Sequence, residues 1–492
     1  MSAPVAKVDR IIEGAHRVYF GNRAVTDRLE AGAQRLREPL RIALAGAVKA
    51  GKSTLLNALV GQDIAPTDAT ECTRVVTWYR HGATPAVTAW LADGRSANVP
   101  VQRADGGLTF DLGSLSADQV EQIDVDWPVG RLARTTIIDT PGTTSLSTEV
   151  SARTLRLLTP DTGSAGADGV VYLFRSLDDS DLALIRQIGE HVGGSAGPLG
   201  IVGVVSRADE LGAGRPDAMH SARAAAKDFT RELELTGLCQ AAIPVAGLLA
   251  FAAKTLRQSE FVALRQLAQV APADLELAML SADRFQRADH LPIDTSTRQH
   301  LVRRLGLFGI RMTLTRLRAG TTDSPALADE LIARSGIGEL ERVIDIQFGQ
   351  RADELKAHTA LLMLKQVLDT NPAPSTAPLI REVATLLANM HGFHELRLLG
   401  RLRCTETALS DDELSDLQRV IGGQGTGPAE RLGIEPFAIA GVGQDVALAE
   451  ISRWRSRAEH PLADQFTASA CLVAARSAEG VLSELRHNSG QL

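Results

Sequence analysis

The stretch Gly46-Ala47-Val48-Lys49-Ala50-Gly51-Lys52-Ser53 matches the phosphate-loop pattern G-x-x-x-x-G-K-[ST]. A strand-like apolar run, residues 42–45, precedes it, and a helix-like run, residues 54–60, follows it. Glycines at this spacing let the backbone curl so that its N–H groups face phosphate oxygens at the positive end of a helix. A loop of this kind between a strand and a helix predicts a nucleotide-binding α/β domain.

Two side chains of this loop have expected tasks. Lys52 reaches the β- and γ-phosphates, and Ser53 offers its hydroxyl to Mg²⁺. We expect the whole segment to surround the phosphates: Gly46, Ala47, Val48, Lys49, Ala50, Gly51, Lys52, Ser53 and Thr54. The alternative is a chance match in a chain with 43 glycines, and the strand before the loop and the helix after it disfavour that alternative.

A second motif, Asp139-Thr140-Pro141-Gly142, ends the strand-like run of residues 135–138. In phosphate-loop proteins a carboxylate at the end of a neighbouring strand holds Mg²⁺. The backbone N–H of Gly142 can reach the γ-phosphate, so the loop after it, residues 143–148, can respond to hydrolysis. Alone, this tetrapeptide is an ordinary turn. Downstream of a phosphate loop, it predicts that Asp139 is a metal ligand and that Gly142 contacts the nucleotide.

A third motif, Ser206-Arg207-Ala208-Asp209, closes the apolar strand-like run of residues 201–205. Guanine-specific proteins usually carry [NT]-K-x-D here, because the Asp accepts hydrogen bonds from the guanine N1–H and exocyclic amine, which adenine cannot supply. The stem of Arg207 can still cover the face of a base, so Asp209 is the deciding residue. The alternative is an ordinary aspartate at the end of a strand. The run 242–247 suits a last base-contacting loop, in which Ala246 offers backbone groups.

The remaining pattern divides the chain into an α/β part and a helical part. Strand-like runs alternating with helical stretches predict a mixed, mainly parallel sheet; the runs are 41–46, 73–80, 86–92, 134–140, 168–174, 199–205 and 241–247. Helical periodicity covers 257–290, 297–319, 323–370, 376–403, 410–421 and 444–488. We predict an N-terminal helix (5–38, within a segment 1–40) that packs with the bundle, a nucleotide-binding domain (41–255) and an all-helical bundle or stalk (256–492).

Composition limits the classes of function. The chain has 52 Lys and Arg against 59 Asp and Glu, a net charge of −7, which excludes a general polyanion binder, so we expect no nucleic-acid partner. The four widely spaced cysteines indicate neither a disulfide scaffold nor a zinc site and are typical of a reducing cytosol. We find no spanning helix and no signal peptide, and we expect a soluble cytoplasmic protein, at most peripherally membrane-bound.

Taken together, the motifs resemble the dynamin superfamily, and within it the bacterial dynamin-like proteins, particularly the shorter members of the mycobacterial isoniazid-inducible group. The likeness is carried by VKAGKSTLLNALVG (48–61), ATECTRVVT (69–77), SGIGELERVI (335–344) and RADELKAHTAL (351–361). It implies GTP hydrolysis with Mg²⁺, pairing of GTPase domains with another copy or a longer dynamin-like relative, and coupled movement of the bundle. It also implies an anionic membrane surface as partner, at the inner face of the plasma membrane, and a link to cell-wall stress and drug tolerance.

Two site residues follow from the resemblance. Among the threonines of the segment 66–74, Thr73 matches the family's Mg²⁺-binding threonine, with Thr70 as the alternative. Dynamins carry Gln-Ser where this chain has Val48 and Lys49, and valine cannot orient the attacking water. In the related guanylate-binding proteins an arginine at the position of Lys49 acts as an internal finger. We therefore expect Lys49 to stabilise the β–γ bridging oxygen when a partner domain presses the loop inward; the alternative is a solvated lysine on a slow enzyme.

Three weaker patterns remain open. His391, His394 and Glu395 have a spacing that suits a metal or, more simply, an amphipathic helix. The basic run 298–318 suits either an anionic lipid surface or a bundle helix, and the apolar run 432–442 suits a membrane-dipping tip or a plain loop. For the whole chain, two functions are considered: a GTPase, and a GTP-binding scaffold with little turnover. The loss of the glutamine favours the scaffold. A ribosome-assembly GTPase is disfavoured by the acidic pI.

Overall fold

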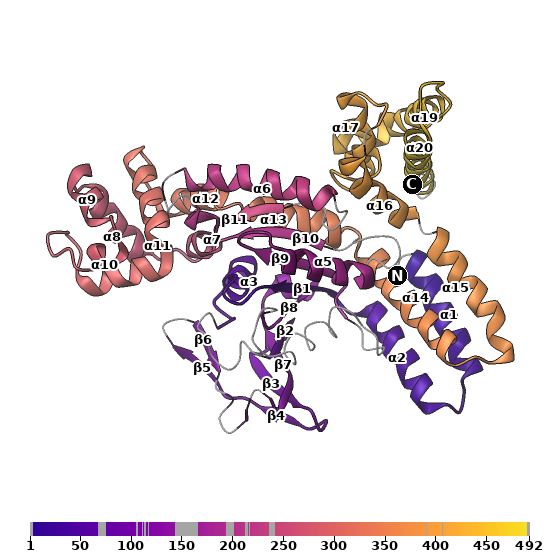
Figure 1. Ribbon diagram of the computed structural model, residues 1–492, viewed down its shortest axis with the longest axis horizontal. Helices are drawn as coiled ribbons and strands as arrows, with labels where there is room; N and C mark the ends of the chain where they lie inside the picture. Colours follow the sequence, from indigo (N-terminus) through magenta and orange to yellow (C-terminus); the bar gives the residue numbers. More distant parts are fainter. Residues whose placement is uncertain are drawn as a thin grey trace.

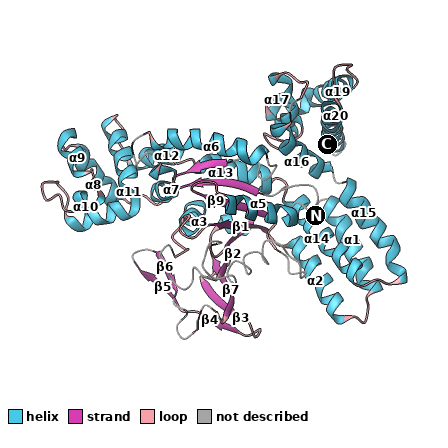
Figure 2. Cartoon of the chain, viewed as in Figure 1, coloured by secondary structure: helices cyan, strands magenta, loops and turns pink. Residues whose placement is uncertain are grey.

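The computed structural model describes most of the chain. The exceptions are residues 1–2, 67–74, 105–106, 111, 113–114, 117, 143–165, 193–200, 212–214, 216, 236–241, 390, 406 and 490–492. Within the described part, a central sheet lies between two groups of helices, and a further helical group lies beside it (Figures 1 and 2).

The described strands form a nine-stranded sheet in the order β11-β10-β9-β1-β8-β2-β7-β3-β4. Their bounds are β1 (Leu40–Gly46), β2 (Val76–His81), β3 (Ala86–Leu91), β4 (Ser96–Asn98), β7 (Val120–Trp127), β8 (Thr135–Asp139), β9 (Gly169–Phe174), β10 (Ile201–Ser206) and β11 (Ala242–Val245). The strands from β11 to β8 in this order all pair in parallel, whereas β2 is antiparallel to β8 and β3 is antiparallel to β7. The predicted mixed, mainly parallel sheet is confirmed.

The sequence analysis missed several strands at the antiparallel end of the sheet. Strand β7 is central to this end, and its buried residues Ile123, Val125 and Trp127 alternate with Asp124 and Asp126. That alternation is the mark of a strand with one face on the core. A separate two-stranded ribbon is formed by β5 (Val101–Ala104) and β6 (Gly107–Phe110). Strands β5 and β6 were not predicted because such short runs carry little hydrophobic signal.

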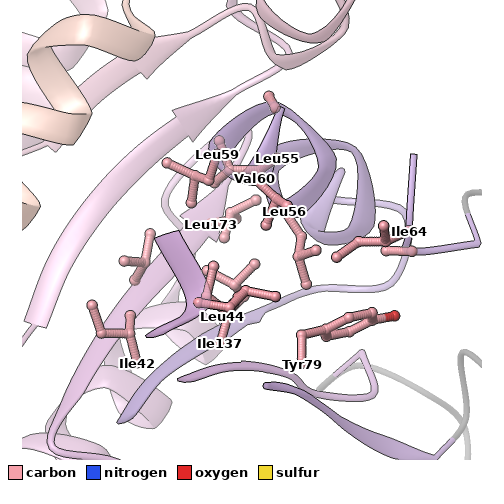
Figure 3. Close-up of a cluster of buried hydrophobic side chains, with 14 of the residues drawn as sticks. Ile42, Leu44, Leu55, Leu56, Leu59, Val60, Ile64, Tyr79, Ile137 and Leu173 are labelled. Carbon is pink, nitrogen blue, oxygen red and sulfur yellow. The ribbon is translucent and has the colours of Figure 1, made fainter. Parts of the chain in front are cut away.

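Helix α3 (Lys52–Val60) packs on the sheet directly behind the phosphate loop. Figure 3 shows Leu55, Leu56 and Leu59 of this helix facing Leu44 of β1 and Leu173 of β9. The helix is short and its buried face is wide, so tertiary packing rather than intrinsic propensity holds it in place. Three more helices complete the α/β unit: α5 (Asp179–Val192), α6 (Ala218–Leu235) and α7 (Gly247–Lys254).

The single N-terminal helix expected over residues 5–38 is wrong. The structure has two helices, α1 (Ala3–Val18) and α2 (Arg23–Arg37), with a turn between them. Gly21 has φ +100° in this turn, and the side chain of Asn22 accepts a hydrogen bond from the N–H of Val25 as an N-cap. The apolar period continues through both helices because both pack on the same neighbours, which hides the turn from a periodicity analysis.

The chain beyond residue 255 is helical in every described element, as predicted, but its helices are shorter and more numerous. Their bounds are α8 (Gln258–Ala268), α9 (Pro272–Ala278), α10 (Ala282–Gln286), α11 (Thr295–Arg318), α12 (Ser324–Arg334), α13 (Ile337–Ile344), α14 (Ala352–Thr370), α15 (Ala377–Asn389), α16 (His391–Cys404), α17 (Asp411–Val420), α18 (Pro428–Leu432), α19 (Ile439–Ala458) and α20 (Gln465–Ser489). The long helices expected over 257–290, 323–370 and 444–488 are therefore each divided.

These helices contribute to four separate cores. Helices α7 to α12 share one core with α6, and α13 adds Ile337 and Leu340 to the core of the sheet itself. Helices α1 and α2 pack with α14 and α15 around Leu29 and Leu361. Helices α16 to α20 have their own core around Trp454. In Figure 1, the α8–α11 group lies to the left of the sheet and the α1–α2–α14–α15 group to its right.

A buried ion pair joins the sheet to the α1–α2–α14–α15 group. Asp168, just before β9, accepts hydrogen bonds from the guanidinium of Arg35 in α2 and from the backbone N–H of Arg41 (2.8 Å). Lys356 of α14 donates to the carbonyl oxygens of Leu36 (3.2 Å) and Glu38 (3.3 Å). Because both charges of the pair are buried, removal of either one would leave the other uncompensated in the interior.

Gly336 and Gly338 provide a matched test of how α13 is attached. Gly336 has φ +79°, and a Cβ there would lie 2.1 Å from the carbonyl oxygen of Pro244 in β11, whereas a Cβ on Gly338 meets nothing within 4 Å. We expect Gly336→Ala to lower the free energy of unfolding by roughly 2–4 kcal/mol, from backbone strain and the clash. Gly338→Ala should raise it by up to about 1 kcal/mol, since alanine is the better helix former.

Urea unfolding of the two glycine variants, followed by circular dichroism, checks this expectation. Equal midpoints for Gly336→Ala and Gly338→Ala would contradict the close approach of α13 to β11.

Candidate functional site

The carboxyl ends of the parallel strands meet at one edge of the sheet, where phosphate-loop proteins bind ligands. Strand β1 ends there at Gly46, β8 at Asp139, β10 at Ser206 and β11 at Val245. The three motifs found in the sequence are therefore neighbours in space.

The phosphate loop, residues 46–53, needs unusual backbone angles. Gly46 has φ +139°, and a Cβ there would lie 2.1 Å from the carbonyl oxygen of Leu173 in β9. Gly51 has φ +94°, and Lys49 has φ +62°, which is uncommon for a residue with a side chain. These angles produce the tight curl that the sequence pattern predicts, and they place Val48 and Lys49 at the exposed tip of the loop.

Lys52 lies inside this curl. Its ammonium donates hydrogen bonds to the carbonyl oxygens of Gly46 and Ala47, each at 3.1 Å. Burial lowers the pKa of Lys52, and the nearby carboxylate of Asp139 opposes that effect. A partly buried cation within a ring of backbone groups is the arrangement that receives phosphate oxygens.

Ser53 and Asp139 form the candidate metal centre. The hydroxyl of Ser53 donates to Oδ2 of Asp139 at 2.8 Å. The other oxygen, Oδ1, is buried and has no hydrogen-bond partner among the described residues. Burial raises the pKa of Asp139. A bound divalent cation would lower this pKa again, because it favours the charged carboxylate. An orphaned carboxylate oxygen beside a hydroxyl fits Mg²⁺, which prefers oxygen ligands and keeps several waters. Thr70 and Thr73 lie outside the described residues, as does the loop 143–148.

Gly142 brings the second motif against the phosphate loop. A Cβ on Gly142 would lie 2.4 Å from Cγ2, 2.7 Å from Cα and 2.8 Å from the backbone nitrogen of Val48. Thr140 fixes the same segment to β1, because its hydroxyl donates to the carbonyl oxygen of Leu44 at 2.8 Å. Only glycine fits at 142, and the two motifs are in direct contact at Val48, whose side chain is otherwise 47% exposed.

A cavity of about 180 Å³ lies beside the phosphate loop, where a base would follow the phosphates. Its lining residues come from the loop, the third motif and the end of β11: Ala50, Gly51, Thr54, Leu55, Leu173, Val204, Ser206, Arg207, Asp209, Glu210, Val245, Gly247 and Leu248. Burial raises the pKa of Asp209. The structure thus places Thr54, Arg207 and Asp209 around one cavity.

Arg207 shapes the wall of this cavity through its backbone and its side chain. It has φ +51°, and its guanidinium donates to Glu210 at 2.8 Å, so its stem is held close to the cavity. The hydroxyl of Ser206 donates to the carbonyl oxygen of Phe174 at 3.1 Å and ties β10 to β9. Serine therefore takes a structural role at the position where asparagine or threonine is usual.

Ala246, expected to contact the base through its backbone, lies differently. It is fully buried and its N–H donates to the carbonyl oxygen of Ser335 at 2.9 Å. The next residues, Gly247 and Leu248, line the cavity instead. The sequence signal was a strand followed by small residues, which locates the loop but does not resolve which of two neighbours faces the cavity.

The metal possibility at His391, His394 and Glu395 gains no support from the geometry. Glu395 accepts hydrogen bonds from Arg431 (2.9 Å), Arg351 (3.1 Å) and the hydroxyl of Ser477 (2.7 Å). Burial acts to raise the pKa of Glu395, but the bonds and charges of these arginines lower it to about 2. Among the described residues there is no cluster of metal-ligating side chains.

The basic run 298–318 forms α11, and several of its arginines are engaged within the protein. Arg298 is buried and donates to the carbonyl oxygen of Gln286 at 3.0 Å. Arg304 donates to Glu260 at 3.0 Å, and Arg318 donates to the carbonyl oxygen of Val270 at 2.7 Å. These contacts favour the bundle-helix interpretation. In the run 432–442, Phe437 is 85% exposed.

None of the helices in the described ranges is long and apolar enough to cross a bilayer.

Comparisons with known proteins identify the family of the chain. The sequence profile of the Dynamin family matches residues 42–163. The chain is 53% identical over 485 residues to the isoniazid-induced protein IniC of Mycobacterium tuberculosis, in two strains, which covers 97% of this chain and 98% of that protein. A bacterial dynamin-like protein of Nostoc punctiforme shares 45% identity over 56 residues, which is 11% of this chain and 8% of that protein.

Solved structures of an oligomerised bacterial dynamin pair, described as a mechanism for long-range sensing and tethering of membranes, also match. They share 13% identity and cover 99% of this chain and 75% of their own, but the TM-scores of 0.28 and 0.30 are too low to carry an argument. The full-length identity to IniC and the family profile are sufficient by themselves: the chain belongs to the dynamin family, among its IniC-type members.

Proposed function

We propose that this protein binds GTP with Mg²⁺ and hydrolyses it to GDP and phosphate. The observation that carries the proposal is the meeting of three parts at one edge of the sheet: the Lys52 ammonium inside the curled loop, the Ser53–Asp139 pair and the cavity beside Asp209. Membership of the dynamin family supports GTP as the nucleotide.

The residues of the phosphate loop and its neighbours have separate roles in this proposal. Lys52 and the N–H groups of the loop 46–53 bind and orient the phosphates. Ser53 and Asp139 would hold Mg²⁺, and Thr73 is proposed as the third protein ligand. When bound there, the ion would supply positive charge beside the phosphate oxygens. We assign the contact with the γ-phosphate to the backbone N–H of Gly142, whose lack of a side chain lets it pack directly against Val48.

Guanine selectivity is assigned to Asp209. Its carboxylate would accept hydrogen bonds from N1–H and the exocyclic amine of guanine. A buried acceptor left without these donors costs free energy, so adenine is rejected. Gly247 lines the same cavity.

Lys49 is proposed as the group that replaces the missing glutamine. It is exposed at the tip of the loop, where a partner GTPase domain could press it inward, and its φ of +62° already holds the tip in a strained conformation. Turnover would then require pairing across the nucleotide, with another copy of this chain or a longer dynamin-like relative. Release of the loops after hydrolysis would move the helical half, and an anionic membrane at the inner face of the plasma membrane is the proposed site of action, in cell-wall stress and drug tolerance.

A GTP-binding scaffold with little turnover is the second candidate. The contact between Val48 and Gly142 favours it, because an apolar side chain stands where a water-orienting group is usual. The Lys49 experiment below separates the two candidates.

Lys52→Ala tests nucleotide binding. Loss of the charged donor should weaken retention of GTP by about 100-fold, since a hydrogen bond to a charged group contributes about 1.5–3 kcal/mol. Equilibrium dialysis with Mg²⁺ measures the retention, and Lys227→Ala on the exposed face of α6 is the control. Unchanged retention in Lys52→Ala would remove the basis of the proposed function.

Asp209→Asn tests the choice of base. The amide can donate to the 2-oxo group of xanthine but matches the guanine amine poorly, so GTP affinity should fall about 100-fold or more while xanthosine triphosphate gains. Asp228→Asn is the matched control, because Asp228 is an exposed aspartate on α6 that does not line the cavity. Competition binding with both nucleotides gives the ratio, and an unshifted ratio would assign selectivity elsewhere.

Lys49→Ala tests the finger. Turnover at high protein concentration should fall at least about ten-fold, with GTP affinity nearly unchanged, because the charge acts in the transition state. Lys49→Arg should preserve turnover. The measurement is GTP turnover against protein concentration, with and without anionic liposomes. Equal plateaus for wild type and Lys49→Ala would refute the finger, and a flat trace near zero for wild type would favour the scaffold.

A further inference from the structure

The last turn of α3 is capped by two cations that come from other elements. The ammonium of Lys254, at the end of α7, donates to the carbonyl oxygen of Ala58 at 2.8 Å. The guanidinium of Arg131, in the turn Gly130–Ala133 before β8, donates to the carbonyl oxygen of Leu59 at 2.8 Å. The last carbonyls of a helix have no partner within the helix, and its negative end attracts cations.

One carboxylate oxygen holds both cations. Oε1 of Glu341 lies 2.5 Å from the Lys254 ammonium and 2.6 Å from the Arg131 guanidinium. The side chains of Glu341 and Lys254 are only 23% and 16% exposed, so water screens this pair less than an ordinary surface ion pair. The shared carboxylate also offsets the repulsion between two cations at the end of the same helix.

Glu341 belongs to α13, and α13 is itself firmly attached to the nucleotide-binding unit. The carbonyl oxygen of Ser335, just before α13, accepts the N–H of Ala246 beside the base cavity. Ile337 and Leu340 are fully buried in the core of the sheet. At its other end, α13 continues through a π-helical turn, Asp345–Gly349, into α14 of the helical half. The contact therefore connects the end of α3 to the start of the helical half.

The opposite end of α3 carries Lys52 and Ser53. A nine-residue helix is a rigid rod about 14 Å long, so a displacement of its last turn moves its first turn too. Near the last turn of α3, the side-chain oxygen of the buried Asn57 accepts hydrogen bonds from the N–H groups of Ile64 (2.9 Å) and Ala65 (2.8 Å). These bonds fix the segment that continues toward Thr73 to the last turn of the helix.

We propose that Glu341 is a positioning residue for the nucleotide site. It holds Lys254 and Arg131 on the last carbonyls of α3, which sets the position of α3 and of the phosphate loop and links that position to α13. This inference rests on the proposed nucleotide binding and adds the residue through which α13 acts on it.

The test uses Glu341→Gln in the full chain, which removes the charge and keeps the shape. Glu339→Gln is the matched control, because Glu339 is an exposed glutamate on the same helix. Phosphate binding by α3 is common to GDP, GTP and the transition state. Glu341→Gln should therefore raise the GDP dissociation constant and the KM for GTP by the same factor, about five-fold, with kcat within about two-fold of wild type.

Lys254→Gln gives a second check. It should raise the same constants by a similar factor, and the double variant with Glu341→Gln should be no worse than about the larger single effect, because both changes break one contact.

Amide hydrogen exchange makes the test independent of GTP turnover. In the nucleotide-free protein, the amides of residues 57–61 should exchange at least about five-fold faster in Glu341→Gln than in wild type, and at the wild-type rate in Glu339→Gln. A wild type that binds GDP but hydrolyses no GTP would contradict the proposed turnover and leave this inference standing. A lowered melting temperature with unchanged GDP affinity and unchanged exchange would show a purely structural role for Glu341 and overturn it.

Discussion

The close approach of β1 and β9 at the start of the phosphate loop is the constraint on which the site depends. The carbonyl oxygen of Leu173 occupies the space where any side chain at position 46 would begin, so only glycine can stand there. The chain must then turn sharply to enter α3, and it does so through positive φ angles at Gly46, Lys49 and Gly51. Asp139 ends β8, which pairs with β1, and Ser206 ends β10, which pairs with β9. One packing arrangement therefore positions all three parts of the proposed site.

Helix α3 is held at both of its ends, and each end has a different chemical task. Its first turn carries Lys52 and Ser53, where the helix dipole favours anions. Its last turn receives the cations of Lys254 and Arg131. The starts of β1 and β9 are also attached through charge, by the buried pair of Arg35 and Asp168. Electrostatic contacts, in addition to apolar packing, therefore join the sheet to its helical surroundings.

The sequence was most informative where function demands a particular backbone. The curl of residues 46–53 and the glycine at 142 were predictable because few residue types fit those positions, and the structure places them in contact. The turn at 19–22, the break at Gly336 and the strand β7 were not predicted. The turn at 19–22 was hidden because the apolar spacing continues through it, and β7 was missed although its residues alternate. The break at Gly336 depends on a tertiary neighbour, the carbonyl oxygen of Pro244, which periodicity does not contain. Glu341 was invisible for the same reason, since its partners lie 87 and 210 residues away.

Backbone strain adds a physical argument about the catalytic loop. Among the described residues, Lys49 and Arg207 are the two non-glycine residues with positive φ, and both border the nucleotide site. A side chain in this conformation costs about 1 kcal/mol relative to glycine. At Arg207 a contact accompanies the strained backbone: the ion pair with Glu210 holds the side-chain stem beside the cavity. At Lys49 the isolated chain offers no comparable contact within the described structure, and the side chain is exposed at the tip of the loop. A residue that acts only when two GTPase domains pair would show such backbone strain without a compensating contact in the isolated chain. The strain at Lys49 therefore favours the proposed finger over a solvated lysine.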